Sequence, residues 1–388
     1  MDIHEYQAKK ILNNFGVLIP KGRIAYTPLE AQKIAEKSSG SGMVVKAQIH
    51  SSDRLNGHFI EKSAGIGGGI RFAGTPQEVG SQAKAMLGAT LVTSQTSPKG
   101  KTVSKVYVEE FCDCRKTFYF AMTINRTAAR IELRLGNIEK ETPKIQHDSF
   151  FTIPLETAEV TYQETLKGAE YLGVEAAKFH QFIAGVLQSF IKSEAIMIEI
   201  NPAGVMPNGD IIALDAKMVL DDAALFRHKE LSRLIDEDEI TPLKRRAAIN
   251  GFVYHEYDGY IGCIVNGDGL ALAMKGLLKD DTACTLNLKG GVDRDKIAAG
   301  IKLIATNAKV EGIIINIIGG FLRCDLIADG IIDAAAEVGM NVPLVVRLEG
   351  TNSLEARNIL NHSGLNFLMC ETTLEAVQKI LIAAREAG

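Results

Sequence analysis

The clearest pattern of hydrophobic and polar residues lies near the middle of the chain, where two short apolar runs flank a turn. Residues 196–201 read Ile-Met-Ile-Glu-Ile-Asn, and residues 211–217 read Ile-Ile-Ala-Leu-Asp-Ala-Lys. An Asn-Gly pair stands between them, so the pattern predicts an antiparallel hairpin. Glu199, Asn201 and Asp215 alternate with apolar residues along the two predicted strands. We therefore expect these three side chains to lie on adjacent strands.

This hairpin has two interpretations. Carboxylate and amide oxygens held on paired strands suit a Mg²⁺ ion that carries nucleotide phosphates, because Mg²⁺ takes one or two such protein ligands. The alternative is a half-buried hairpin with a polar face and no bound ion. Such hairpins are common, so the hairpin alone favours the second interpretation.

Helical and strand-like patterns alternate through the first 190 residues. They predict helices at about 2–15, 28–37, 163–172 and 174–191, and strands at 43–50, 103–110 and 118–124, of which the last two are neighbours. Lys46 lies within the first strand, where it is either an edge-strand charge or a point charge for nucleotide phosphates. Glu109 or Glu110, where the second strand ends, could accept hydrogen bonds from a ribose or an adenine amine.

Residues 51–70 are irregular and rich in glycine. Glycine-rich backbone can approach phosphates closely and cradle them with its amides. A surface loop without a ligand explains the same composition equally well.

The second half of the chain has a different pattern. An acidic run at 235–242 ends in proline and predicts a solvated linker with no other role. Beyond it, strand-like runs at 262–265, 313–318, 342–348 and 366–370 are each followed by a glycine or polar turn and a helix. Such repeated units predict a doubly wound parallel sheet, whose ligand sites lie beyond the carboxyl ends of the strands.

Two glycine turns, at 266–269 and 319–322, therefore mark a candidate anion site, since the helices that follow them present free amides. Alternatively, the glycines only permit tight turns between strand and helix. The chain contains no G-x-G-x-x-G motif, which disfavours a dinucleotide-binding fold.

Composition narrows the class of protein. A chain of 388 residues predicts two or three domains, and a net charge of -4 without a basic block argues against nucleic-acid binding. The longest apolar run is far too short for a membrane span, and the charged start lacks the apolar core of a signal peptide. Six scattered cysteines favour reduced thiols over a metal site. We expect an intracellular protein, either cytoplasmic in a bacterium or in the mitochondrial matrix after trimming.

Six short motifs occur in order along the chain. They are His-Glu-Tyr-Gln-Ala-Lys at 4–9, Val-Lys-Ala-Gln at 45–48, Glu-Ile-Asn-Pro at 199–202, Leu-Asp-Ala-Lys at 214–217, Val-Asn-Gly at 265–267, and Gly-Gly with Arg-Cys-Asp at 319–325. Together they resemble the β subunit of succinyl-CoA synthetase, a family that includes the similar malate–CoA ligase β subunit. The resemblance implies an α/β fold. An ATP-grasp module of two subdomains would span 1–240, with one subdomain inserted at about 20–105, and a flavodoxin-like doubly wound parallel α/β domain would span 241–388.

The resemblance also implies a reaction. The family joins a carboxylate to CoA at the expense of ATP or GTP, through an acyl phosphate and a phosphohistidine, and releases the nucleoside diphosphate and phosphate. The phosphorylated histidine and most of the CoA site belong to an α subunit, in an αβ or α2β2 assembly. Succinate is the expected acid, and the cofactor is Mg²⁺.

Roles for individual residues follow from the same motifs. The resemblance implies nucleotide contacts by Lys46, Asp53, Arg54, Leu55 and Glu109, magnesium ligation by Asn201 and Asp215, carboxylate-substrate binding by Asn266, Gly320, Phe321 and Leu322, and orientation of the partner's histidine by the catalytic Glu199.

Some positions depart from the family pattern. Where the family has Gly-Gly-Arg-Gly-Lys, residues 52–56 read Ser-Asp-Arg-Leu-Asn, which places Asp53 where phosphates approach. A second glycine cluster at 67–69 compensates only if the loop folds back toward this stretch. Asp268 replaces a small residue beside the predicted substrate site. These departures leave one alternative, a weakly active or non-catalytic β-like subunit with a structural or regulatory role. A second alternative is a malate–CoA ligase β subunit, because the choice between succinate and malate is open.

Overall fold

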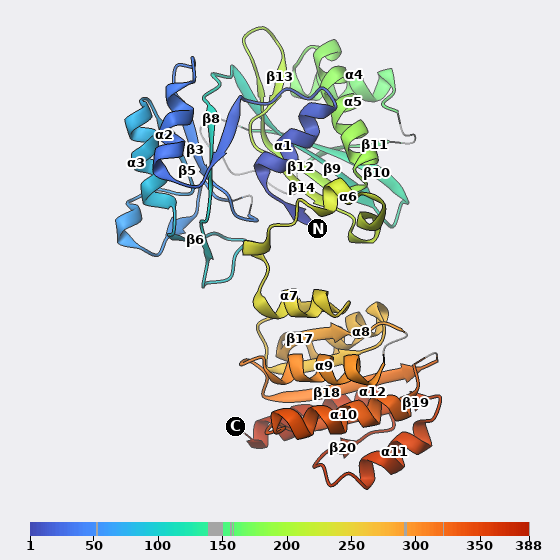
Figure 1. Cartoon of the computed structure of the whole chain (residues 1–388). Coiled ribbons are helices and arrows are strands. Elements are labelled where there is room, and N and C mark those ends of the chain that lie inside the picture. The colour runs from blue at the N-terminus through green and yellow to red at the C-terminus, as the bar shows by residue number, and fades with distance from the viewer. Residues whose placement is uncertain are drawn as a thin grey trace. The chain divides into compact units, whose positions relative to one another are not determined.

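The computed structural model describes residues 1–51, 53–138, 150–155, 157, 159–290, 293–320 and 322–387. The chain divides into two compact units, residues 1–239 and residues 240–388 (Figure 1). Each unit has its own sheets and its own hydrophobic core.

The larger sheet of the first unit has seven strands, all paired antiparallel. Its order is β1 (Asp2–Ile3), β14 (Lys217–Leu220), β12 (Ala195–Val205), β9 (Lys116–Asn125), β10 (Arg130–Asn137) and β11 (Phe151–Leu155), and β13 (Ile211–Ala213) pairs with β12 off this path. Three helices pack against it, namely α1 (Glu5–Asn14), α4 (Tyr162–Leu172) and α5 (Ala176–Lys192). Figure 1 shows α1 and α5 over this sheet, where their apolar faces and alternate strand residues form one core.

A four-stranded antiparallel sheet forms the second layer of this unit. Its order is β2 (Gly22–Ala25), β8 (Val106–Glu110), β3 (Met43–Ala47) and β5 (Ile70–Ala73), and it is covered by α2 (Pro28–Glu36) and α3 (Pro76–Met86). Both helices start in the same way, because Thr27 and Thr75 each cap the helix and a proline follows at its first position. A small three-stranded sheet of β4 (His58–Phe59), β6 (Thr90–Val92) and β7 (Lys101–Thr102) is formed by segments that lie between β3 and β8 in the sequence.

The second unit contains a six-stranded sheet with helices on both faces. Its order is β15 (Val253–Glu256), β17 (Thr282–Asn287), β16 (Ile261–Val265), β18 (Gly312–Gly319), β19 (Leu344–Gly350) and β20 (Leu368–Met369). All pairs are parallel except that of the edge strand β15. One face packs against α8 (Asp268–Leu278) and α12 (Thr373–Ala387), and the other against α9 (Arg294–Ala305), α10 (Cys324–Val338) and α11 (Ser353–Asn361). The predicted doubly wound parallel sheet is thus present.

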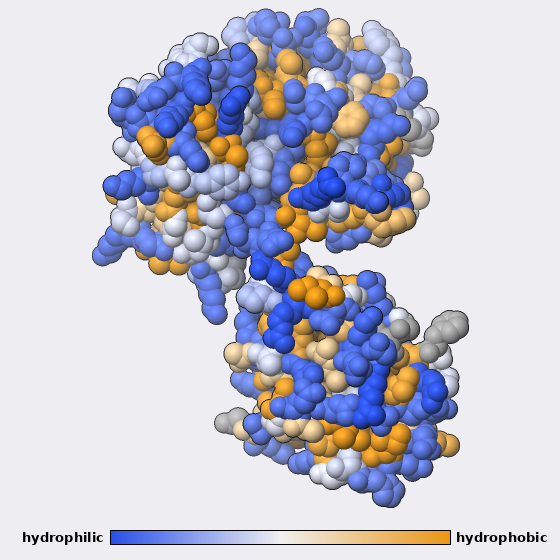
Figure 2. Space-filling model, viewed as in Figure 1, coloured by the Kyte–Doolittle hydropathy of each residue, from blue (hydrophilic) through white to orange (hydrophobic). Residues whose placement is uncertain are grey.

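Short helical segments complete the described chain. They are η1 (Lys62–Ala64), η3 (Asp222–Arg227), α6 (Lys229–Ser232), η4 (Glu237–Glu239), α7 (Pro242–Ile249) and η5 (Lys279–Asp281). Within the ranges given above, no helix is long and apolar enough to cross a membrane. On the face shown in Figure 2, hydrophilic residues predominate on both units and hydrophobic residues form small, separate patches.

Four expectations from the sequence were wrong in detail. Strands β8 and β9 are not neighbours, because β8 pairs with β2 and β3 whereas β9 pairs with β10 and β12 in the other sheet. Lys46 is not on an edge strand, since β3 lies between β8 and β5. Asp215 is not on a strand but in the bend between β13 and β14. The acidic run is not a solvated linker without another role, because its Asp236 binds His4.

Candidate functional site

Six charged side chains meet inside the first unit, although they come from distant parts of the chain. Helix α1 contributes two of them, β3 and β8 one each, the segment after β3 one, and the bend after β13 one; they are Glu5, Lys9, Lys46, Glu109, Arg54 and Asp215. All six are buried. Because three are cations and three are anions, this charged cluster is neutral overall.

The two lysines of the cluster share the same acceptors. The Lys9 and Lys46 ammonium groups each lie 2.8 Å from Glu5 Oε1. They bind opposite oxygens of Glu109, at 2.5 and 2.6 Å, and both donate to the Leu214 carbonyl. An ammonium has three hydrogens, so each lysine has an acceptor for every one of them. In this arrangement Lys46 has no hydrogen left for a phosphate.

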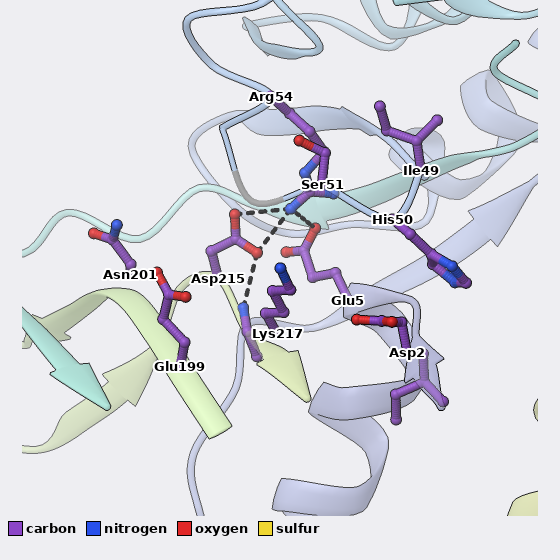
Figure 3. A pocket seen from close by; sticks show the side chains of 12 residues that line it. Asp2, Glu5, Ile49, His50, Ser51, Arg54, Glu199, Asn201, Asp215 and Lys217 are labelled. Carbon is purple, nitrogen blue, oxygen red and sulfur yellow. Dashed lines mark hydrogen bonds and ion pairs between the residues drawn. The ribbon is translucent and has the colours of Figure 1, made fainter. Parts of the chain in front are cut away.

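Arg54 links the other oxygen of Glu5 to Asp215 (Figure 3). Its Nη2 lies 2.7 Å from Glu5 Oε2 and 2.7 Å from both carboxylate oxygens of Asp215. Its Nη1 donates to the Ala47 carbonyl at 2.9 Å, while its buried Nε has no partner among the described residues. The guanidinium is therefore held from three directions.

The mutual pairing shifts the ionisation of these groups. Burial opposes the ionisation of Glu5, but the charges of Lys46, Lys9 and Arg54 outweigh it and hold the pKa of Glu5 well below its ordinary value. Burial likewise disfavours the charged forms of Lys46 and Arg54, yet the surrounding carboxylates raise the pKa of both. Glu5, Lys46 and Arg54 therefore stay charged at neutral pH.

Glycines fix the backbone that carries Arg54. The Gly69 amide donates to the Arg54 carbonyl at 2.7 Å. A Cβ atom on Gly68 would lie 2.0 Å from the Leu55 carbonyl oxygen, so only glycine fits at this position. The second glycine cluster thus does lie against residues 54–55, although its contacts are with the backbone of the loop.

A small cavity of about 20 Å³ lies beside Arg54 and Asp215, and Glu199 and Asn201 also line it. The Asn201 side chain has no hydrogen-bond partner within the described part of the chain. One amide and one carboxylate are hard oxygen donors, so the chemistry of this pair fits Mg²⁺. Both oxygens of Asp215, however, already accept from Arg54.

The structure does not bring the other two residues of the predicted phosphate loop to this cavity. Asp53 accepts hydrogen bonds from Asn56 at 2.8 Å and from Ser94 at 2.5 Å, and the Leu55 side chain is 60% exposed. The acid therefore does not face the charged cluster.

A larger cavity of about 760 Å³ lies in the same unit, near the opposite end of β3 from Lys46. Four basic residues and two acidic ones are among those that line it: Lys21, Arg23, Lys33, Lys37, Glu30 and Glu110. Its size is in the range of cavities that hold small organic ligands.

In the second unit, the predicted substrate residues lie at the carboxyl ends of β16 and β18. The Asn266 side chain donates to the Ile318 carbonyl at 2.8 Å and accepts from the Ile318 amide at 3.1 Å. The Gly320 carbonyl accepts from Thr351, and the Leu322 side chain is buried. Phe321 lies outside the described residues. Asn266 therefore joins the carboxyl ends of β16 and β18.

Sequence reasoning missed three residues of the first site. Glu5 and Lys9 belong to the motif at 4–9, which predicts no role for them, although both share the face of α1 that carries the buried Ala8 and Leu12. The available signal was that two charged residues four positions apart share a helical face with apolar residues, which indicates that they are buried with them. Lys217 lines the small cavity and has no partner among the described residues.

Comparisons with known proteins agree with this architecture. A family model described as an ATP-grasp domain matches residues 2–205, and one described as CoA-ligase matches residues 264–381. Over 399 aligned residues the chain is 40% identical to the β subunit of succinate–CoA ligase [ADP-forming] from Acidiphilium cryptum and 39% identical to that from Rhodospirillum rubrum, with all of this chain and all of each relative covered.

A solved structure of ATP citrate lyase from Methanothrix soehngenii, in complex with citrate and coenzyme A, has the same fold. It superimposes with a TM-score of 0.67 at 15% identity, over 98% of this chain and 99% of that one. These findings confirm the predicted fold class. The chain belongs to the family of ADP-forming succinate–CoA ligase β subunits.

Proposed function

We propose that this chain is the β subunit of an ADP-forming succinate–CoA ligase, which converts ATP, succinate and CoA into succinyl-CoA, ADP and phosphate. The observation that carries the proposal is the 40% identity to such a subunit along the entire chain. The relatives from Acidiphilium cryptum and Rhodospirillum rubrum are ADP-forming succinate–CoA ligase subunits, which favours succinate and ADP over malate and GDP.

The nucleotide phosphates would bind at the charged cluster. Lys46 and Arg54 supply the positive charge, and Asn201 and Asp215 would hold Mg²⁺, which when bound neutralises phosphate charge. The rest of the nucleotide would occupy the 760 Å³ cavity. Two strands connect this cavity to the charged cluster. Met43 of β3 and Glu110 of β8 line the cavity, and Lys46 and Glu109 of the same strands belong to the cluster.

The second unit would bind the carboxylate substrate at the loops after β16 and β18, near Asn266 and residues 320–322. An α subunit would supply the histidine that carries the phosphoryl group and most of the CoA site, in an αβ or α2β2 assembly. Glu199 would orient that histidine. The bacterial relatives favour the cytoplasm as its location.

A coupled assay of the chain purified with its α subunit tests this function. We expect succinyl-CoA formation from ATP, and a loss of about 100-fold or more in kcat/KM for Lys46→Ala, because a buried positive charge beside the proposed phosphate site is removed. Lys62→Ala, an exposed lysine, should have wild-type activity. A folded complex that forms no acyl-CoA from succinate would refute the proposal, and a preference for malate would reassign the acid.

A further inference from the structure

Arg54 sits where the proposed metal site would have to form. We infer that Arg54 is an internal counter-ion of Asp215, so that a divalent cation can bind this carboxylate only after the guanidinium has left it. The inference rests on the proposed nucleotide site of the first unit, and it concerns how that site is closed before the nucleotide binds.

The carboxylate of Asp215 is already bound to a cation of the protein. Both carboxylate oxygens of Asp215 lie 2.7 Å from Arg54 Nη2, and Oδ1 also accepts from the Ala216 amide at 2.8 Å. Asn201, by contrast, has no side-chain partner in the described ranges. One of the two proposed ligands is therefore free, and the other is bound to a protein cation.

The cavity beside Asp215 is also small. The cavity between Arg54, Asp215 and Asn201 has a volume of about 20 Å³, which is room for about one water molecule. A Mg²⁺ ion usually keeps several waters or phosphate oxygens in its shell in addition to its protein ligands. The space beside the Asp215 carboxylate is taken by the Arg54 guanidinium, whose Nη2 lies 2.7 Å from both oxygens (Figure 3).

The net charge of the cluster also disfavours a cation that binds alone. The cluster is neutral with Arg54 in place, so a divalent cation alone would add two uncompensated positive charges to a buried site. A cation that arrives with nucleotide phosphates brings its own anions. Arg54 can then exchange Asp215 for phosphate oxygens, which suit its planar fork of donors, while keeping Glu5 and the Ala47 carbonyl as partners.

The test measures binding of Mn²⁺ alone to the full-length chain by electron paramagnetic resonance. We expect Arg54→Gln to bind Mn²⁺ at least about 10-fold more tightly than the wild type, since Asp215 loses its internal cation. Arg134→Gln, at an exposed arginine of β10, is the matched control and should not change the affinity. The double variant Arg54→Gln with Asp215→Asn should lose the gain.

A second variant tests the inference without leaving an unbalanced charge in the cluster, which could prevent folding. Glu5→Gln combined with Arg54→Gln removes one charge of each sign, keeps the cluster neutral and still frees Asp215. It should show the same gain in Mn²⁺ affinity. Unchanged affinity in this folded double variant, or a gain that survives Asp215→Asn, would overturn the inference. A separate titration of Mg-ADP into the wild type distinguishes the two proposals, because absence of nucleotide binding counts against the function and not against the role of Arg54.

Discussion

At the scale of single residues, Glu5 is the centre of the charged cluster. One of its oxygens contacts both Lys9 and Lys46, and the other contacts Arg54 and, at 3.3 Å, Gln48. No other carboxylate of the cluster contacts all three cations among the described residues. Glu5 thus holds the proposed phosphate-binding side chains in a fixed relation to α1.

We therefore predict that Glu5→Gln lowers the free energy of unfolding by about 3–5 kcal/mol, because it leaves three buried cations with two carboxylates. Urea denaturation followed by circular dichroism measures this loss. Glu170→Gln, at an exposed position of α4, should stay within about 0.5 kcal/mol of the wild type. Equal stability of the two variants would mean that the cluster is not coupled to folding.

The sequence allowed some of these residues to be predicted, but not their contacts. Lys46, Arg54 and Asp215 stand in short motifs, and the structure brings them together as expected for one site. Two of these contacts depend on how four distant segments pack. They are the binding of Arg54 to Asp215 and the pairing of the buried Glu109 with two lysines. Local patterns carry no information on such pairing.

At the scale of elements, the loop after β3 is shaped by glycine contacts rather than by its own side chains. Gly68 lies against the backbone of residues 54–55 so closely that any Cβ would clash. We predict that Gly68→Ala displaces this stretch and moves Arg54 away from Asp215. In a crystal structure of the variant, the distance between the Arg54 guanidinium and the Asp215 carboxylate should exceed 2.7 Å. Gly276→Ala, in α8, is the control for glycine content, because no atom lies within 4 Å of a Cβ there and the backbone is helical. An unchanged Arg54 in Gly68→Ala would contradict the prediction.

The acidic segment that was expected to be a solvated linker is a structural contact instead. Asp236 pairs with His4 at 2.5 Å and with Lys105, and Glu239 pairs with Lys101 and accepts from the His50 amide. The hydrogen bonds with Lys105 and His4 outweigh burial and lower the pKa of Asp236 to about 2. Charge runs look alike in sequence whether or not they find partners, so composition could not distinguish these cases.

The half-buried His50 makes the first unit sensitive to acid. Burial and the adjacent His4 lower the pKa of His50 to about 4, whereas an unfolded histidine titrates near about 6.5. Between these values the unfolded chain binds a proton that the folded chain does not, so stability falls as the pH drops from about 6.5 to about 4. We predict a loss of about 2 kcal/mol over this range that is smaller in His50→Asn, measured by urea denaturation at each pH. The exposed His58→Asn should keep the wild-type dependence, and an equal flattening in both variants would exclude His50 as the source.

The positions of helices and strands were predicted better than the pairing of the strands in sheets. The hairpin of β12 and β13 and the repeated strand–turn–helix units follow from short-range periodicity, and both are present. The assignment of β8 and β9 to one sheet failed, because residues 111–115 carry the chain from one sheet to the other without a distinctive sequence signal. Strands β10, β15 and β17 were not predicted, since hydrogen bonding to neighbouring strands decides their pairing.

At the scale of the whole molecule, the two units have independent interiors. Helices α1, α4 and α5 complete the core of the larger sheet in the first unit, while the core of the second unit is formed by its parallel sheet and the helices on both faces. Each unit is large enough to fold around a core of its own. Unfolding should therefore occur in two steps.

Differential scanning calorimetry of the full chain, with one matched core substitution in each unit, tests this expectation. Leu133 in β10 and Leu286 in β17 are both fully buried, so replacing either by alanine should cost about 2–5 kcal/mol. For units of this size, such a loss lowers the midpoint of one transition by about 5–15 °C. We predict that Leu133→Ala shifts one transition and Leu286→Ala shifts the other, because neither side chain belongs to the core of the other unit. A single transition that both substitutions lower equally would show that the two units unfold as one cooperative body.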